Sequence, residues 1–518
     1  MPELRPPDSI REITRTLERA GHEAWCVGGA VRDALLGIDT LDWDIATSAR
    51  PEQVQKLFKR TIPVGIQFGT VGVLDRDGVL HEVTTFRHDV ETDGRHAVVK
   101  FGASLEEDLA RRDFTVNAIA VHAETLELRD PFDGRADLER RVIRCVGDAQ
   151  ERMREDRLRA LRALRFAGRF DFALDPATWT AIVDSAPHLG RLSMERVKQE
   201  LEKVMEQVAR PSVTLERYRA AGIFAALVPA LAAAPTARFA AVDFLARPGL
   251  ARRPDRRMLR LAALFVEPGV APARELEKTL KQLKFSNVEV RATLALAAAA
   301  GDQPWAATAR AAESATSAAA AASAASSGSP ASRVSAESVG FPASPASPQG
   351  DHLLSEMAER RGDDPSASAR VAATHAAQTA QTAPTAPTAP TAPTAQAARW
   401  AASLALDGEQ LRRAIARAGR LMVPGLTRIL WARAKAEGAT AAQGRQGLAL
   451  YRRALRSAFT DPLSVADLAI DGEDLQREGV AAGKAMGDAL KYLLDVVLAD
   501  PAKNTREALL AALRARLA

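Results

Sequence analysis

The sequence C-V-G-G-A-V-R-D-A-L-L-G-I-D-T-L-D-W-D-I-A, residues Cys26 to Ala46, sets the expected fold of the N-terminal part of the chain. A strand leads into the double glycine Gly28 and Gly29, a short helix carries Arg32, and a second strand follows. Because glycines have no side chains, backbone N–H groups at this turn could approach a phosphate closely. The order of strand, glycine turn, helix and strand favours a phosphate-binding site over a chance turn.

Two aspartates in the second strand predict a metal site. Asp42 and Asp44 are two residues apart, and residues i and i+2 of a strand point to the same side of a sheet. Two like charges held together usually mean that a metal ion sits between them. Arg32, one turn into the helix, is placed to meet the negative charge of a triphosphate. Together these residues predict an Mg²⁺-dependent nucleotidyl-transfer site, in which metal ions activate the attacking oxygen and hold the leaving pyrophosphate.

A hairpin downstream offers a third carboxylate. The run G-T-V-G-V-L-D and the run V-L-H-E-V-T-T-F flank the turn D-R-D-G, which predicts a hairpin by alternation and by turn chemistry. Leu80, Glu82 and Thr84 then share one face of the second strand. If that face adjoins the strand of the aspartates, Glu82 joins the site. A solvent-exposed Glu82 without a ligand is the alternative.

A polar cluster interrupts the next apolar stretch, L-A-R-R-D-F-T-V-N-A-I-A. It contains Arg111, Arg112, Asp113 and Asn117. Such a cluster either braces a sheet or contacts a ligand, and the sequence leaves both interpretations open.

A basic helix is the third predicted element of the site. In E-D-R-L-R-A-L-R-A-L-R-F, residues 155–166, Asp156, Arg159, Arg162 and Arg165 recur at every third position beside a parallel leucine stripe. Asp156 can accept from the exocyclic amine of cytosine or adenine while Arg159 donates to the neighbouring ring nitrogen. Uracil and guanine present a carbonyl at that place, which the carboxylate would repel. The alternative is an ordinary solvated basic face.

Composition sets limits on these interpretations. The chain has 518 residues, of which 47% are hydrophobic and 26% charged, so it should form more than one domain. Because the net charge is only +5, a polyanion site has to be local. The basic residues gather in one short segment at Arg152, Arg154, Arg157, Arg159, Arg162, Arg165 and Arg169.

The cysteines and the hydropathy favour a cytoplasmic protein without a membrane partner. Cys26 and Cys145 give neither a metal-site spacing nor a disulfide framework, which suits a reducing compartment. The N-terminus lacks the apolar region of a signal peptide, and no strongly apolar run reaches the roughly 18 residues of a membrane span.

The chain resembles class II CCA-adding tRNA nucleotidyltransferases, within the family shared with bacterial poly(A) polymerases. The matching stretches follow the family order over residues 25–170: V-G-G-A-V-R-D-A-L-L-G with L-D-W-D-I-A-T, V-G-I-Q-F-G-T-V, H-E-V-T-T-F-R, L-E-E-D-L-A-R-R-D-F-T-V-N-A-I-A, D-P-F-D-G-R-A-D-L and E-D-R-L-R-A-L-R-A-L-R-F. Weaker matches to the family's tail lie at Asp467–Leu475 and Asn504–Leu510.

The resemblance implies an α+β fold, with a mixed-sheet nucleotidyltransferase head followed by an all-helical neck, body and tail. It also implies template-independent addition of C, C and A to tRNA 3′ ends from CTP and ATP, with no DNA partner. The expected division of the chain is head 1–150, neck 151–225, body 226–300, insert 301–398 and body with tail 399–518. The insert is dominated by Ala, Ser, Thr and Pro and has no counterpart in the family, so we expect a disordered linker.

The resemblance also implies roles for individual residues. Magnesium would be bound by Asp42 and Asp44, with Glu82 as a third catalytic carboxylate. The nucleotide would be contacted by Gly28, Gly29, Arg32 and Arg112. In the neck, Asp156 and Arg159 would pair with the base, and Arg162 and Arg165 would support the base and the phosphates.

Departures from relatives refine the expected reaction. Residues 259–264 are followed by Phe265, Val266 and Glu267 instead of the His-Asp signature of many bacterial relatives, so no phosphohydrolase activity is expected. G-I-Q-F at residues 65–68 replaces the G-R-R-F typical of poly(A) polymerases, which favours tRNA. The segment 87–96 matches the flexible loop that enzymes adding only CC tend to lack, so the terminal A is expected.

The sequence leaves four alternatives open. Within the family, the chain could be a poly(A) polymerase or an enzyme that adds only A. From other classes, the metal motif alone fits a D-x-D glycosyltransferase, and the basic helix alone fits a non-catalytic RNA-binding protein.

Overall fold

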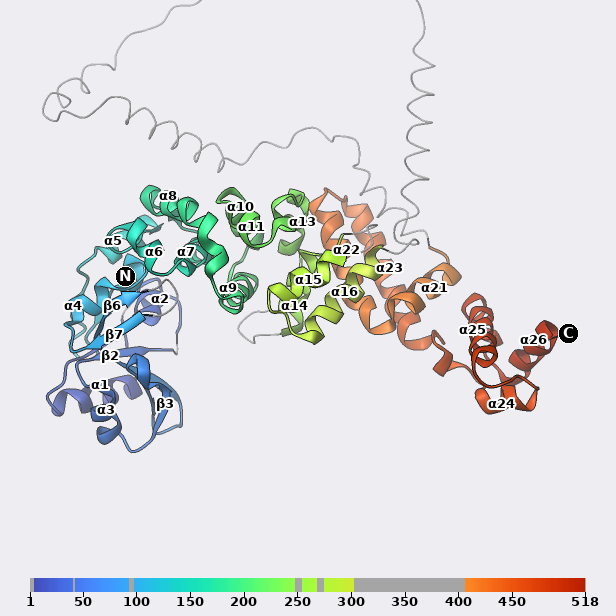
Figure 1. The fold of residues 1–518 in the computed structure, drawn as a ribbon, viewed down its shortest axis with the longest axis horizontal. Coiled ribbons are helices and arrows are strands. Elements are labelled where there is room, and N and C mark those ends of the chain that lie inside the picture. The colour runs from blue at the N-terminus through green and yellow to red at the C-terminus, as the bar shows by residue number, and fades with distance from the viewer. Residues whose placement is uncertain are drawn as a thin grey trace, which may run out of the picture. The chain divides into compact units, whose positions relative to one another are not determined.

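A computed structural model describes residues 4–40, 42–92, 97–246, 254–267, 274–301 and 406–517. Residues 302–398 of the predicted insert lie outside the described residues. The described part begins with α1 and mixes helices with strands as far as residue 174, after which its elements are helices (Figure 1).

The N-terminal part contains a mixed sheet, as predicted. Seven described strands run in the order β3-β4-β5-β2-β1-β8-β9, and β2 and β5 are parallel while the other neighbours are antiparallel. The bounds of all strands are β1 Ala24–Val27, β2 Asp44–Thr47, β3 Thr61–Gly65, β4 Thr70–Leu74, β5 Leu80–Thr85, β6 Arg87–Thr92, β7 Ala97–Phe101, β8 Ala120–Val121, β9 Leu128–Arg129, β10 Val142–Ile143 and β11 Ala173–Leu174. The helices among them are α1 Asp8–Arg19, α2 Gly29–Leu35, α3 Pro51–Leu57, α4 Leu105–Ala110, α5 Gly134–Arg140 and α6 Ala149–Glu155.

Strand β1 lies inside the sheet because both of its faces are apolar. Its four residues A-W-C-V are all buried. Cys26 packs into one hydrophobic cluster, whereas Trp25 and Val27 pack into another on the opposite face. The double glycine that follows β1 is therefore fixed to the centre of the sheet.

The predicted hairpin is confirmed as β4 and β5. The two strands pair from Thr70 with Thr84 to Leu74 with Leu80. The Asp75 carboxylate accepts hydrogen bonds from the backbone N–H groups of Asp77 and Val79 and closes the turn. Because β5 also pairs with β2, the face of Glu82 adjoins the strand of Asp44.

Two local expectations are wrong. The predicted strand does not include Asp42, because β2 begins at Asp44. The segment 87–96 is not a loop over its first residues, since residues 87–92 form β6, which pairs with β7. Residues 93–96 lie outside the described residues.

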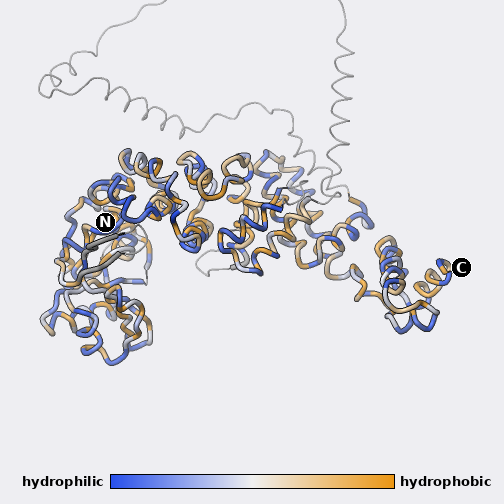
Figure 2. The backbone as a smooth tube through the Cα atoms, in the orientation of Figure 1, coloured by the Kyte–Doolittle hydropathy of each residue, from blue (hydrophilic) through white to orange (hydrophobic). Residues whose placement is uncertain are grey.

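The remaining described residues are helical. In order, the helices are α7 Leu158–Phe170, α8 Pro176–Ser185, α9 Met194–Gln207, α10 Pro211–Ala220, α11 Ile223–Leu227, α12 Pro229–Ala232, α13 Thr236–Asp243, α14 Pro254–Ala263, α15 Arg274–Gln282, α16 Asn287–Gly301, α21 Gly408–Ala418, α22 Val423–Ala436, α23 Ala441–Thr460, α24 Gly472–Arg477, α25 Lys484–Ala499 and α26 Arg506–Leu517. Figure 2 shows hydrophobic and hydrophilic residues alternating along these helices, as expected where one side of each helix is buried. Among the described helices, none has the length and apolar character that crossing a bilayer requires.

Helix α7 connects the sheet to the helical part. The ring centroid of Phe166 in α7 lies 5.8 Å from that of Phe114, which follows α4, and the two rings meet edge to face. On its other side α7 packs against α9 and α10. One hydrophobic cluster runs from α1 through α7 and α23 to Leu498 of α25, while a separate cluster is formed within residues 470–513.

Candidate nucleotide site

A cavity of about 400 Å³ brings the sheet and the helical part together. Its walls come from the glycine turn, β2, the polar cluster, α7 and α9. The lining residues are Gly28, Gly29, Arg32, Asp44, Arg112, Asp113, Asn117, Arg162, Arg165, Phe166, Arg169, Lys203 and Gln207. The glycine turn, Asp44 and the later arginines of the basic helix therefore share one cavity.

The turn at Gly28 requires glycine. Its φ is +77°, a backbone conformation that residues with a side chain rarely adopt. A Cβ atom added at Gly28 would lie 3.0 Å from Nη1 of Arg112 and 3.6 Å from Oδ2 of Asp44. The missing side chain leaves the space in which a cationic and an anionic group face each other.

The predicted carboxylates gather at this turn. Asp44 is partly buried, whereas Asp42 and Glu82 are exposed. Burial, together with the negative charges of Asp42 and Glu82, raises the pKa of Asp44 to about 6 against the opposing effect of Arg112. Within the described residues, no group of three or more His, Cys, Asp or Glu side chains is arranged to hold a metal ion.

Arg32 is buried and held from three directions. Its Nε and Nη2 donate to Oδ1 of Asp33 at 2.8 and 2.6 Å, and its Nη1 donates to Asn117. Its guanidinium lies 5.0 Å from the ring of Phe166 and 4.7 Å from the ring of Phe170. Arg32 thus reaches the cavity with a fixed orientation.

Asp113 braces the polar cluster against α7. It accepts hydrogen bonds from Asn117 at 2.8 Å and from Nε of Arg162 at 2.8 Å. Burial alone would raise its pKa, but the charge of Arg162 and the hydrogen bonds from Asn117 and Arg162 hold the pKa near 2. The sequence left two interpretations of this cluster open, bracing a sheet or contacting a ligand. The hydrogen bonds of Asp113 show that it braces the structure. Asp113, Arg112 and Asn117 also line the cavity.

Helix α9 supplies site residues that the sequence analysis missed. Glu200 is buried and accepts from Nε of Arg165 at 2.6 Å, while Gln207 accepts from Nη1 of Arg165 at 3.1 Å. Lys203 lies beside them and donates to Glu200 at 3.1 Å. Glu200, Lys203 and Gln207 recur at spacings of three and four, but α9 is rich in charged residues, so this helical spacing was the available signal and did not separate them from the exposed charges.

Asp156 and Arg159 are placed differently from Arg162 and Arg165, which line the cavity. The helix predicted over residues 155–166 begins later, because α6 ends at Glu155 and α7 begins at Leu158. Asp156 caps Leu158 and pairs with Arg196 at 2.6 Å, and Arg159 donates to Glu155 and to the carbonyl of Arg111. Neither residue lines the cavity, nor do Asp42 and Glu82.

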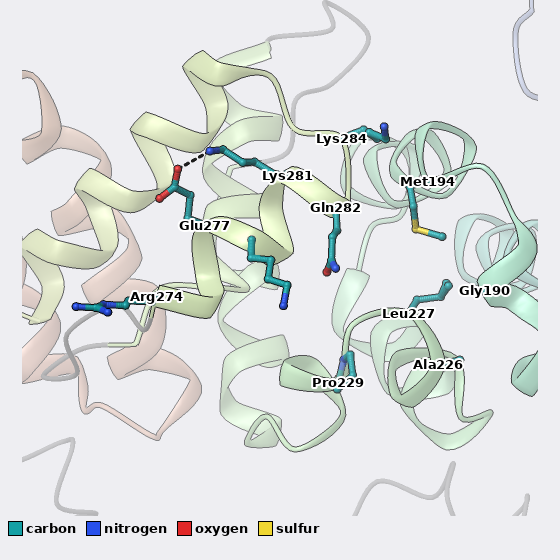
Figure 3. A pocket seen from close by; sticks show the side chains of 11 residues that line it. Gly190, Met194, Ala226, Leu227, Pro229, Arg274, Glu277, Lys281, Gln282 and Lys284 are labelled. Atoms are coloured by element: carbon teal, nitrogen blue, oxygen red, sulfur yellow. Dashed lines mark ion pairs between the residues drawn. The ribbon is translucent and has the colours of Figure 1, made fainter.

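A second cavity of about 930 Å³ lies between α15 and the segments that contain Met194 and Leu227 (Figure 3). Its basic side chains are Arg274, Lys278, Lys281 and Lys284. Lys281 pairs with Glu277 at 2.6 Å, and both side chains are more than half exposed.

Three protein families match separate parts of the chain. "Poly A polymerase head domain" matches residues 24–144, which hold the glycine turn and the aspartates. "Probable RNA and SrmB-binding site of polymerase A" matches residues 171–234. A tRNA nucleotidyltransferase domain 2 family matches residues 460–513, which include the weaker motif matches near the C-terminus.

Curated relatives decide the family. The chain is 44% identical over 306 residues to the CCA-adding enzyme of Geobacillus kaustophilus. The aligned region covers 58% of this chain and 72% of that protein. The chain belongs to the family of CCA-adding enzymes. It is also 50% identical over 195 residues to the family member from Leuconostoc mesenteroides, covering 37% of this chain and 48% of that protein.

Solved structures of family members share the fold. The crystal structure of the Bacillus stearothermophilus CCA-adding enzyme in complex with CTP is similar with a TM-score of 0.62 and 28% identity, over 99% of this chain and 98% of that chain. The Thermotoga maritima CCA-adding enzyme complexed with tRNA has a TM-score of 0.53 at 18% identity, over 98% and 95% of the two chains, and supports the fold alone. The predicted fold class is therefore confirmed.

Proposed function

We propose that this protein adds C, C and A to the 3′ end of tRNA without a nucleic-acid template. The tRNA 3′-hydroxyl attacks the α-phosphate of CTP or ATP, and pyrophosphate leaves. One observation carries the proposal: Asp44 of β2 and the arginines of α7 line the same cavity beside the Gly28 turn. A D-x-D glycosyltransferase gives no reason for these arginines, and a non-catalytic RNA-binding protein gives none for the partly buried Asp44.

The carboxylates fit Mg²⁺. Magnesium usually binds one or two protein carboxylates and fills its other positions with water and substrate phosphates. Asp44 and Asp42 provide that donor set, and their mutual repulsion has little compensation apart from Arg112. When bound, the metal ion supplies activation of the attacking oxygen and stabilisation of the pyrophosphate. In this proposal Glu82, on the neighbouring strand, supports the two aspartates.

The arginines bind the nucleotide from several sides. Arg112 faces Asp44 across the glycine turn and is held by Asp108 at 3.1 Å, and Arg32 is fixed by Asp33 and Asn117. Their donors meet the triphosphate while Gly28 and Gly29 leave space for it. Fixed donors of this kind stabilise charge that develops at the phosphate without reorganising.

Base selection is assigned to α7 and the residues before it. Arg162 and Arg165 line the cavity, and Asp156 and Arg159 pair with the base after Asp156 releases Arg196. Replacing Arg159 by Ala should then lower the preference for CTP and ATP over UTP and GTP, since each bidentate contact to a base contributes about 1–3 kcal/mol. Unchanged discrimination in single-nucleotide incorporation contradicts this assignment.

The decisive assay uses tRNA lacking its last three, two or one nucleotides. The purified protein should extend all three to complete CCA ends with CTP and ATP, which sequencing of the 3′ ends measures. Extension of only the CC-ended tRNA supports the A-only alternative, and long A tails on mRNA support a poly(A) polymerase.

The metal assignment has its own test. Asp44→Asn should reduce incorporation by at least two orders of magnitude, because it removes a ligand from a site with few protein ligands. Asp75→Asn serves as the control, because Asp75 lies in the β4–β5 turn of the same sheet and has no role in the proposed metal site. Chelation with EDTA should stop incorporation by the unaltered protein, and Mg²⁺ should restore it. Activity that survives both Asp44→Asn and EDTA contradicts the metal site.

The second cavity supports tRNA binding by the helical part. One of its walls lies within residues 171–234, the range of the RNA-binding family match, and the other carries three lysines and an arginine. Their ion pairs within the chain are exposed and weak, so phosphates can replace the carboxylates. Lys278→Glu with Lys281→Glu should weaken tRNA binding and reduce its salt dependence. The control variant carries Lys56→Glu and Lys59→Glu on the head, which change the net charge by the same amount. If both double variants weaken tRNA binding equally, the binding site is not local to the second cavity.

Each step of the proposed reaction is assigned to one segment of the chain. We assign catalysis to the head at residues 1–150, nucleotide selection to the neck at 151–225, and tRNA binding to the helical residues 226–300 and 399–518. We also place the protein in the cytoplasm, and the two free, buried cysteines support this location.

A further inference from the structure

We infer that Asp33 is a positioning residue, which joins the phosphate-binding turn to the base-selecting helix and so sets the nucleotide selectivity of the site. The inference rests on the proposed function. Asp33 is not among the residues that line the cavity, so the inference gives it no contact with the nucleotide. Its effect passes through two arginines that do line it, Arg32 and Arg169.

The two oxygens of Asp33 hold different parts of the protein. Oδ1 accepts from Nε and Nη2 of Arg32 in α2, at 2.8 and 2.6 Å. Oδ2 accepts from Nη2 of Arg169 in α7 at 2.8 Å, across 136 positions of sequence. One buried carboxylate thus connects the helix after the glycine turn to the helix that carries Arg162 and Arg165.

Phe170 completes the connection. Its ring has the guanidinium of Arg32 at 4.7 Å and that of Arg169 at 4.8 Å. Two cations close to one ring repel each other unless a negative charge lies nearby, and Asp33 supplies that charge. The side chains of Arg32 and Asp33 are 3% and 10% exposed, so water screens this interaction little.

The side chain of Asp33 is not required for the end of its own helix. The backbone carbonyl of Asp33 accepts from the N–H groups of Leu36 and Ile38, and any replacement keeps that carbonyl. Asp33→Asn keeps the shape of the side chain but places an N–H₂ group toward one arginine. One arginine then loses its acceptor, and α2 and α7 are no longer joined by charge.

The test is a selectivity measurement on the full-length protein. Asp33→Asn should lower kcat/KM for CTP and ATP and reduce discrimination against UTP and GTP roughly tenfold, the factor that corresponds to about 1.4 kcal/mol. The KM for tRNA should stay unchanged, because the connection lies away from the second cavity. A double-mutant cycle with Arg169→Gln should show that the second substitution adds little to the first.

Glu267→Gln is the matched control. Glu267 also shares one carboxylate between two arginines of different helices, Arg238 of α13 and Arg433 of α22, and it lies outside both cavities. Glu267→Gln should lower the free energy of unfolding as Asp33→Asn does, but it should leave nucleotide selectivity unaltered.

The outcomes separate the inference from the proposed function. If the unaltered protein fails to extend tRNA, the proposed function is wrong. If it extends tRNA but Asp33→Asn changes only stability, as Glu267→Gln does, the inference alone is overturned. Independent effects of Asp33→Asn and Arg169→Gln overturn it as well. If Asp33→Asn does not fold, Arg169→Gln decides: reduced selectivity supports the inference and unchanged selectivity overturns it.

Discussion

Gly168 allows α7 to pack closely against α10, and replacing it by Ala tests how firmly the basic helix is placed. A Cβ atom added at Gly168 would lie 2.0 Å from Oγ1 of Thr214 and 3.3 Å from Cγ1 of Val208. Overpacking of this kind costs about 1–3 kcal/mol, and a contact of 2.0 Å forces the upper end of that range. Ala returns about 1 kcal/mol through its better helix propensity. We therefore expect Gly168→Ala to lower the free energy of unfolding by about 2 kcal/mol.

The expected rescue makes this prediction specific. Oγ1 of Thr214 is buried and has no hydrogen-bond partner, so Thr214→Ala removes the clashing atom without breaking a bond. Gly168→Ala combined with Thr214→Ala should recover most of the lost stability, a coupling that independent sites do not show.

The assay is urea unfolding followed by circular dichroism, together with the KM for ATP. Gly168→Ala should also raise that KM, because α7 carries Arg162 and Arg165 into the cavity. Gly487→Ala in α25 is the control, since nothing lies within 4 Å of its added Cβ atom, and it should be neutral or stabilising. If Gly168→Ala behaves like this control, the close approach of α7 and α10 is refuted.

Three further predictions concern the residues that brace the site. The pKa of Asp113 is about 2 in the folded protein, against an ordinary value of 3.8. Its ionised form therefore contributes about 2 kcal/mol to stability, fully above pH 3.8 and no longer once the pH falls through 2. Asp113→Asn should remove that part of the acid dependence of unfolding. Glu200→Gln should lower the free energy of unfolding by about 1.5–3 kcal/mol in urea titrations, because the buried Arg165 loses a charged acceptor. Gly134→Ala should lower the midpoint of thermal unfolding, since its Cβ atom would lie 2.2 Å from the carbonyl oxygen of Thr115; an unchanged midpoint contradicts the tight contact.

The part of the fold that depends on neighbouring residues was predictable. Gly28 and Gly29 punctuate the chain between an apolar strand and a short helix, and the turn D-R-D-G marks the β4–β5 hairpin. Such signals act within a few residues and do not depend on the rest of the molecule. The pairing of β5 with β2 could only be stated as a condition, because strand order is decided by packing over the whole sheet.

The break before α7 was not predictable from periodicity. The arginines recur at every third position from Asp156 onward, so a helix over residues 155–166 was the simplest interpretation. The structure uses Asp156 as an acceptor for the N–H group of Leu158 and for Arg196, which ends α6 and starts α7. Local side-chain hydrogen bonds of Asp compete with helix formation in this way. The sequence offered the residue type but not the competing partner, Arg196, which lies 40 positions away.

The same reason explains why the basic face looked ambiguous. A helix with arginines at every third position is a solvated surface unless carboxylates from elsewhere reach it, and these carboxylates come from remote parts of the chain. Asp113 reaches Arg162, Glu200 reaches Arg165, and Asp33 reaches Arg169. Each guanidinium is thereby oriented before a nucleotide arrives, and a triphosphate has to compete with these carboxylates for donors that are already engaged. If the proposed function is right, binding at this cavity is an exchange of partners for the arginines, and replacing the buried acids should then alter selectivity as replacing the arginines does.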